Sequence, residues 1–295
     1  MLLIIGSVVV FVGIGIGYAM EKGNWGILFQ PAEVFIIGGA ALGAFIISSS
    51  KKTIGVVIHG LKGVMASKPY LREDYVELLA LMNGIFAKIR KEGLKAVEGE
   101  LDNPHESPLF KQYPRFHSNH HAVNLLTDVF RTILITKLKP SQLEALLDAE
   151  IEGYHEELMI PAKKINTVGD ALPGMGIVAA VLGVIITMQK IGSPPAEIGH
   201  SIGAALVGTF LGILACYGFM GPLAQNIEGS ATEEKEYLVV LKTILVAFAA
   251  GIHPQISIEF GRMMVPEGER PTFMELEKAL KEKKGSAKKG GGDDE

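Results

Sequence analysis

The chain has 295 residues with 28 Lys and Arg against 32 Asp and Glu, so its formal net charge is −4. This balance provides no net positive field that would drive binding to nucleic acid. Hydrophobic residues make up 48% of the chain and charged residues only 20%. A single cysteine, Cys216, excludes an intramolecular disulfide and any multi-cysteine metal site. The composition predicts a membrane protein with soluble parts.

Four apolar runs are long enough to cross a bilayer, which takes about 20 residues of helix, with a range of about 17–25. The runs are Leu2–Met20, Val34–Ser50, Ala171–Gln189 and Ile198–Ile227. A cleaved signal peptide is the alternative for the first run, but no basic region precedes it and it is longer than a typical signal core. We expect four transmembrane helices at about residues 2–20, 34–50, 171–189 and 201–223.

Basic residues predict the orientation of these spans. Loops 21–33 and 190–197 carry one Lys each, whereas several Lys follow the second span or precede the third (Lys51, Lys52, Lys62, Lys68, Lys163, Lys164). The segment 51–167 and both termini are therefore expected in the cytoplasm. Residues 1–50 and 168–227 would hold the spans, 228–283 further cytoplasmic helices, and 284–295 a disordered Gly-rich tail.

The segments outside the spans have helical rather than strand patterns, so the predicted fold class is all-α. Apolar residues follow helical spacing from Tyr75 to about Arg90, and amphipathic helices are expected at 124–138, 141–158 and 232–250. Asn103-Pro104 resembles a helix start. Pro140 separates the helix expected at 124–138 from the one expected at 141–158, and Ser141 with Glu144 fits a capping box.

Small residues recur at helical spacing in the last two spans (Gly176, Ala179, Ala180, Gly183; Ser201, Ala204, Ala205, Gly208, Gly212, Ala215). Such residues let helix backbones approach closely. One interpretation is packing within the chain or between copies, and the other is a smooth wall around a partner helix that moves. Pro173 and Pro222 would each kink or hinge a span near its cytoplasmic end.

An ion path needs polar or ionisable groups at membrane depth. The candidates are Thr187, Thr209, Tyr217 and, at the inner edge, Asp170, and no carboxylate is predicted at mid-membrane. A carboxylate that carries protons would then come from a second protein. The hydroxyl of Thr209 suits such a path, but it can also bond to its own helix backbone.

Several longer motifs are specific enough to indicate a protein family. The stretch Val168–Val181 resembles the third membrane span of flagellar stator subunits of the MotA family, in the MotA/TolQ/ExbB superfamily, and Val207–Leu214 with Tyr217–Ala224 resembles the fourth. Shorter matches are Gln30–Glu33, Asp102–Pro104, Leu143–Glu152, Ile258–Arg262 and Arg270–Phe273. The resemblance extends over residues 1 to about 280 and is nearest to the proton-driven branch.

The resemblance implies a stator subunit of the bacterial inner membrane, with five copies around a dimer of the partner MotB. MotB would supply the channel aspartate and the peptidoglycan anchor. By position, Arg90, Glu98 and Glu150 match residues of the contact with the rotor protein FliG. The matches in the ion path and its coupling are Pro173, Pro222, Thr209, Ala180 and Asp170. Ala180 stands where sodium-driven relatives carry threonine, which favours protons. No cofactor is implied.

Three alternatives stay open. A TolQ/ExbB-like energiser would drive an envelope protein instead of a rotor, but those relatives have three spans. A passive scaffold would show no ion flux. An enzyme is disfavoured because no nucleophile–base or phosphate-binding pattern is present.

His117, His120 and His121 depart from the family pattern. His117 and His121 have the spacing of a helical metal pair, but without a third ligand we expect surface histidines and no metal.

Overall fold

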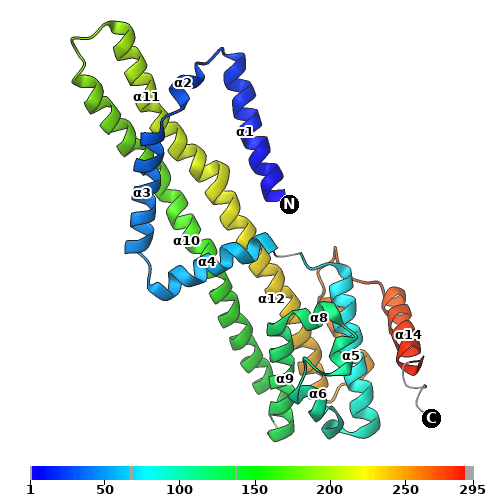
Figure 1. Cartoon of the computed structure of the whole chain (residues 1–295). Coiled ribbons are helices and arrows are strands. Elements are labelled where there is room, and N and C mark those ends of the chain that lie inside the picture. The colour runs from blue at the N-terminus through cyan, green and yellow to red at the C-terminus, as the bar shows by residue number, and fades with distance from the viewer. Residues whose placement is uncertain (1, 67–68, 137, 290–295) are drawn as a thin grey trace. The chain divides into compact units, whose positions relative to one another are not determined.

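The computed structural model describes residues 2–66, 69–136 and 138–289, and within those ranges every regular element is a helix (Figure 1). The predicted all-α class is confirmed. The elements are α1 (Leu2–Met20), α2 (Trp25–Leu28), α3 (Pro31–Ile47), α4 (Lys51–Ala66), α5 (Arg72–Glu92), η1 (Leu94–Val97), α6 (Glu98–Asp102), α7 (Pro108–Lys111), α8 (Pro114–Ser118), α9 (His120–Ile135), α10 (Pro140–Met188), α11 (Pro195–Ile213), η2 (Leu214–Met220), α12 (Gly221–Ala249), α13 (Pro254–Met264) and α14 (Phe273–Lys289).

The chain divides into two compact units. Unit 1 consists of Met1–Ser67 and Glu156–Ala231, and unit 2 consists of Lys68–His155 and Thr232–Glu295. Unit 1 therefore holds α1 to α4, most of α10, and α11 with η2 and the start of α12. Unit 2 holds the start of α10, the rest of α12 and the remaining helices.

Four helical stretches in the described residues are long and apolar enough to cross a membrane: Leu2–Met20, Trp25–Ile47, and parts of Pro140–Met188 and Pro195–Ala249. Their outward side chains are large and apolar, as with Phe35 at 81% and Ile5 at 50% exposure. A lipid bilayer can cover such an apolar surface. The backbone polar groups of a helix are hydrogen-bonded within the helix, as the bilayer core requires. The number of predicted spans is confirmed.

Two small clusters hold unit 1 together. Ile37 and Ala41 of α3 pack with Leu172 and Ala179 of α10 and with Cys216 of η2. The second cluster joins α10 to α12 through Ala162, Ile165, Ala224 and Ile227, and Leu61 of α4 packs against it. The sequence analysis did not identify α4 as a separate helix. The Nζ atom of Lys164 donates to the Ser48 carbonyl at 2.7 Å, close to the start of α4.

Unit 2 has a larger apolar core built mainly from α5, α9, the second part of α12 and α13. Phe86 of α5 stacks on Phe248 of α12 with 4.2 Å between ring centroids. A polar network lies beside this core: the Tyr70 hydroxyl donates to a Glu234 carboxylate oxygen at 2.5 Å, and the Asn119 amide donates to the other at 2.9 Å. The predicted helices at 75–90, 124–138 and 232–250 correspond to α5, α9 and part of α12.

Three local predictions differ from the structure. No helix begins at Asn103-Pro104: α6 ends at Asp102, a turn follows, and the next helix starts at Pro108. The cap of that helix is Ser107, whose hydroxyl accepts from the backbone N–H of Leu109 and of Phe110. The sequence Asn103-Pro104 is equally compatible with a turn, because Asn and Pro are favoured both in turns and at helix starts.

The other two differences concern helix ends. Helix α10 starts at Pro140, and the side-chain oxygen of Gln142 accepts from the Lys139 N–H, so the predicted Ser141–Glu144 capping box is wrong. Proline suits the first helical position, because its missing N–H would have no partner there. At the other end of the chain, α14 continues to Lys289, so residues 284–289 of the expected disordered tail are helical. Residues 290–295 of that tail lie outside the described residues.

Candidate functional site

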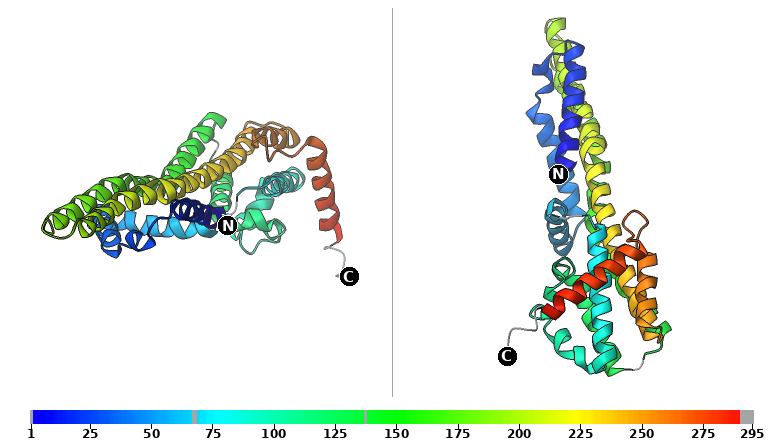
Figure 2. Two further views of the ribbon diagram at one scale, coloured as in Figure 1. Left: turned by 90° about the horizontal axis from the view of Figure 1, so that it is seen from above. Right: turned by 90° about the vertical axis from the view of Figure 1, so that its right-hand side faces the viewer.

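Helices α10 and α11 touch backbone to backbone in unit 1, and they lie side by side in Figure 1 and in the left view of Figure 2. A Cβ atom added at Gly176 would lie 2.7 Å from the Gly208 carbonyl oxygen and 3.2 Å from the Gly212 Cα. One added at Gly183 would lie 2.7 Å from the Ala205 Cβ. Only residues without bulky side chains permit this approach.

The small residues were expected either to pack within the chain or between copies, or to form a wall around a moving partner helix. Their burial in this chain differs from residue to residue. Gly176, Ala179 and Gly183 pack against α11 within the chain, so packing within one copy is confirmed for these residues. Ala180 and Thr209 are only half-buried in this single chain. The Thr209 Cα lies at the close contact, 3.3 Å from a Cβ added at Gly176, but part of the surface of both residues is left uncovered for another helix.

Both prolines of interest lie where the helices are irregular. Pro173 is inside α10, where its ring cannot donate the usual helical hydrogen bond. Pro222 is the second residue of α12 and lies two positions after η2, which is a π-helix over Leu214–Met220. Such segments within α-helices are uncommon and often accompany functional sites. Gly169 approaches the end of η2, since a Cβ added there would lie 3.1 Å from the Met220 Cβ. Asp170 itself is exposed in the single chain.

A buried carboxyl lies in the same unit, at a place that the sequence analysis missed. The predicted apolar run began at Val34 and left Glu33 in a loop, whereas the structure includes Glu33 in the first turn of α3, within the apolar stretch Trp25–Ile47. Its exposure is 7%. Pro31 starts this helix early, and the charge of Glu33 had hidden the continuity.

The residues predicted to meet a rotor lie in unit 2, on exposed positions. Arg90 is in the last turn of α5, and its guanidinium lies 3.1 Å from Nε2 of His253, beside the start of α13. Glu98 begins α6, and Glu150 is on α10. Arg90 and Glu98 are connected through Gly93, which has a positive φ of 86°, and η1.

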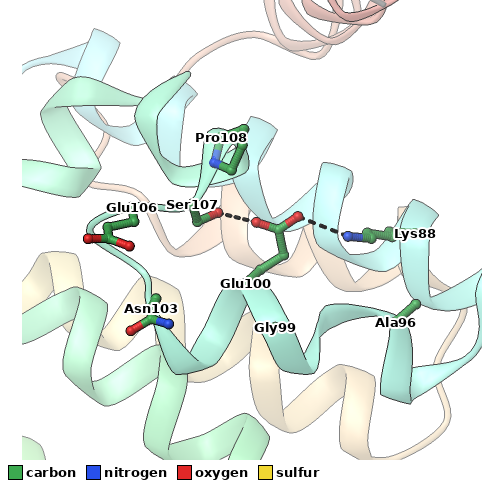
Figure 3. A pocket seen from close by; sticks show the side chains of 8 residues that line it. All are labelled: Lys88, Ala96, Gly99, Glu100, Asn103, Glu106, Ser107 and Pro108. Atoms are coloured by element: carbon green, nitrogen blue, oxygen red, sulfur yellow. Dashed lines mark hydrogen bonds and ion pairs between the residues drawn. The ribbon is translucent and has the colours of Figure 1, made fainter.

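A shallow pocket lies beside this segment, and Figure 3 shows Glu100 between Lys88 and Ser107. The Lys88 ammonium is 2.9 Å from Glu100, and the Ser107 hydroxyl donates to the other carboxylate oxygen. Partial burial opposes ionisation, but the hydrogen bonds from Ser107 and Lys88 outweigh it and lower the pKa of Glu100. Lys88 and Glu100 are thus paired with each other inside the pocket, which favours a structural role for this pair.

The histidines form a different arrangement from the predicted helical pair. His117 lies on α8 and His121 on α9, separated by the cap residue Asn119, so the two do not share a helix face. His117 instead approaches His105, with 3.3 Å between ring nitrogens, and His121 stacks on Tyr154. No group of three or more His, Cys, Asp or Glu in the described ranges is placed to hold a metal ion.

Comparisons with known proteins identify the family. The motility protein A N-terminal model matches residues 4–93, and the MotA/TolQ/ExbB proton channel family model matches residues 117–238. Motility protein A of Salmonella typhimurium is 38% identical over 281 residues, which cover 95% of this chain and 95% of that protein. The chain belongs to the motility protein A family. The resemblance inferred from the motifs is confirmed.

Two solved structures related to the motility protein A family share the fold. That of C. jejuni MotAB gives a TM-score of 0.76 at 19% identity, covering 92% of this chain and 98% of that one. The flagellar MotAB stator complex from Bacillus subtilis gives 0.73 at 21% identity, with 90% and 96% covered. The two family models include Glu33 and Arg90 in one match and Pro173, Thr209 and Pro222 in the other.

Proposed function

We propose that this chain is the ion-channel subunit of a flagellar motor stator, which conducts protons across the bacterial inner membrane together with a MotB partner. The observation that carries the proposal is the 38% identity with a motility protein A over 95% of the chain. In this function the chain is a motor subunit and not an enzyme, and it uses no cofactor other than the translocated ion.

The proposed assembly is a ring of five copies around a MotB dimer, whose aspartate accepts the proton. One charge crossing about 100 mV releases about 2.3 kcal/mol. Protonation removes a charge from a low-dielectric site, and the partner helix can then repack against the small-residue wall. The half-buried Thr209 and Ala180 supply part of that wall. Ala180 offers no hydroxyl to a sodium ion, which supports protons as the driving ion.

Pro173, Pro222 and Asp170 are the proposed coupling elements at the inner end of the spans. They lie on α10 and at the start of α12, next to the π-helical segment η2. Helices with a missing or displaced hydrogen bond bend at lower cost than regular ones. Movement of the partner helix can therefore be passed along α10 and α12.

The proposed contact with the rotor protein FliG uses Arg90, Glu98 and Glu150. All three are exposed, as residues that exchange charge contacts with a second protein must be. With both termini and the segment 51–167 in the cytoplasm, as the Lys distribution favours, unit 2 faces the rotor.

A TolQ/ExbB-like energiser is the second candidate, because the family model that matches residues 117–238 includes those proteins. The four candidate spans and the match of a motility protein A model to residues 4–93 favour the stator.

The test is swimming in a flagellated host that lacks its own stator and receives this chain with its cognate MotB. Swimming that stops on addition of a protonophore supports the proton-driven stator. Absence of swimming with both proteins in the membrane would contradict it for that rotor. Proton uptake by vesicles would then distinguish an energiser, which conducts, from a scaffold, which does not.

A further inference from the structure

The side chain of Glu33 is enclosed by the two close-packed helices of unit 1. A Cβ atom added at Gly208 of α11 would lie 2.5 Å from Glu33 Oε2, and one added at Gly183 of α10 would lie 3.7 Å from Oε1. The carboxyl group therefore occupies the space that a side chain at Gly208 would fill, and it lies within ordinary contact distance of a side chain at Gly183. With Ala179 and Ala205 alongside, the walls of this notch are apolar.

Oε2 of Glu33 is buried and has no hydrogen-bond partner among the described residues. An unpaired carboxylate in apolar surroundings is costly, so the group needs a proton, a cation or a donor at that oxygen. The N-terminal end of α3, in contrast, stabilises the ionised carboxylate. Glu33 lies in the first helical turn, where the helix dipole stabilises negative charge. The two effects act against each other, so a group at this position can both bind a proton and release it.

We propose that Glu33 is a proton-binding site of this chain, separate from the aspartate expected from the partner, in the notch between Gly183 and Gly208. The inference rests on the proposed function, because it gives the site a place on the proton path near the outer ends of the spans. A proton from the outer side forms an O–H bond at Glu33. That bond then breaks with its electron pair left on Glu33, and the proton passes inward to a carboxylate or a water.

The glycine at 208 is part of this site. A methyl group there would also lie 3.0 Å from the Ala179 Cβ, so the carboxyl group rather than α10 is the component that can move. Gly203, on the same helix, provides a matched control, since a Cβ there meets only Ile27 at 3.6 Å. Glu197 is a control for charge: it also lies in the first turn of a membrane helix, but it is exposed.

The experiment uses the full chain with its MotB partner in lipid vesicles, and it compares wild type with E33Q, E33D, E197Q, G208A and G203A. Proton uptake driven by an imposed potential is the first readout. We expect E33Q to lower uptake by about tenfold or more, E33D to keep part of it, and E197Q and G203A to resemble wild type. G208A should lower uptake because it displaces the carboxyl group. Recovery of the complex with MotB checks assembly of each variant.

The second readout is the infrared absorption of protonated carboxyl groups during a pH titration. Loss of one titrating band in E33Q, and a shifted band in G208A, would support a proton at Glu33. If the wild type conducts and E33Q conducts equally, with the same infrared titration, the inference is overturned. Uptake that requires sodium and is lost in E33Q would overturn the assignment to protons. If the wild type conducts nothing, the proposed function fails, and the infrared titration still decides whether Glu33 binds a proton.

Discussion

Gly176 of α10 faces the backbone of Gly208 on α11 so closely that no side chain fits between them. The contact joins two membrane helices through main-chain atoms, which have little freedom to move apart locally. Van der Waals packing of this kind is a main source of association between helices in lipid, where apolar side chains gain nothing by leaving the solvent.

The first prediction concerns this contact. Gly176→Val should destabilise unit 1 by roughly 1–3 kcal/mol, because a bulky side chain must push α11 away. The matched control is Gly174→Val two residues along the same helix, where an added Cβ meets nothing within 4 Å. Thermal unfolding of the purified variants in detergent checks the difference. Equal melting temperatures for the two variants would show that the contact is not tight.

Reversal of charge at Arg90 is the second prediction. Arg90→Glu should abolish most swimming while the protein level stays normal, because the residue is exposed and α5 does not depend on it for packing. Lys111→Glu is the control, since it reverses a charge at another exposed position of unit 2. A compensating acidic-to-basic change on the rotor should restore swimming. Unchanged swimming of the single variant would exclude the rotor contact.

Backbone conformation between Arg90 and Glu98 gives the third prediction. Gly93 has φ of 86° and ψ of 167°, a region that residues with a Cβ avoid. Gly93→Ala should cost about 1–3 kcal/mol, and Gly99→Ala, in open space on α6, should be neutral or stabilising. Chemical denaturation followed by circular dichroism measures both. A Gly93→Ala variant as stable as wild type would show that this turn relaxes freely.

The fourth prediction is a pH dependence. The pKa of Glu100 is lowered from its usual 4.5, despite partial burial, by the hydrogen bonds from Ser107 and Lys88. The ionised group therefore stabilises unit 2 above about pH 4.5, and this contribution is lost as the pH falls through the lowered pKa. Glu100→Gln should be less stable at neutral pH and lose less on acidification. Melting temperatures at neutral and acid pH test this, with Glu106→Gln from the same pocket as control.

Sequence patterns predicted the spans well because hydropathy over some 20 residues reflects a single strong requirement, burial in lipid. They were less able to predict the start of the second span. Glu33 interrupts the apolar run, and a linear pattern cannot show that the glycine at 208 makes room for its carboxyl group, next to Gly183. The enclosing residues are more than 140 positions away in the chain, so only the folded arrangement brings them together.

Short signals failed for a related reason. Asn103-Pro104 and Ser141–Glu144 are compatible with several local structures, and the choice depends on neighbours. Ser107 outcompetes Asn103 as a helix cap because its hydroxyl bonds two backbone N–H groups and also Glu100. Arg90 was singled out by resemblance alone. Its neighbour His253 follows α12 and could not have been inferred from spacing.

The π-helical segment η2 acts as an α-helix that has taken in an extra residue. Each residue of an α-helix advances the direction of the side chains by about 100°. Deletion of one residue within 214–220 would leave an equally apolar helix but would turn the face that carries Gly208 relative to the one that carries Pro222. The number of residues in this segment thus sets the angle between the two faces, independently of side-chain identity. A single-codon deletion here would preserve hydropathy and composition and still change which surfaces meet.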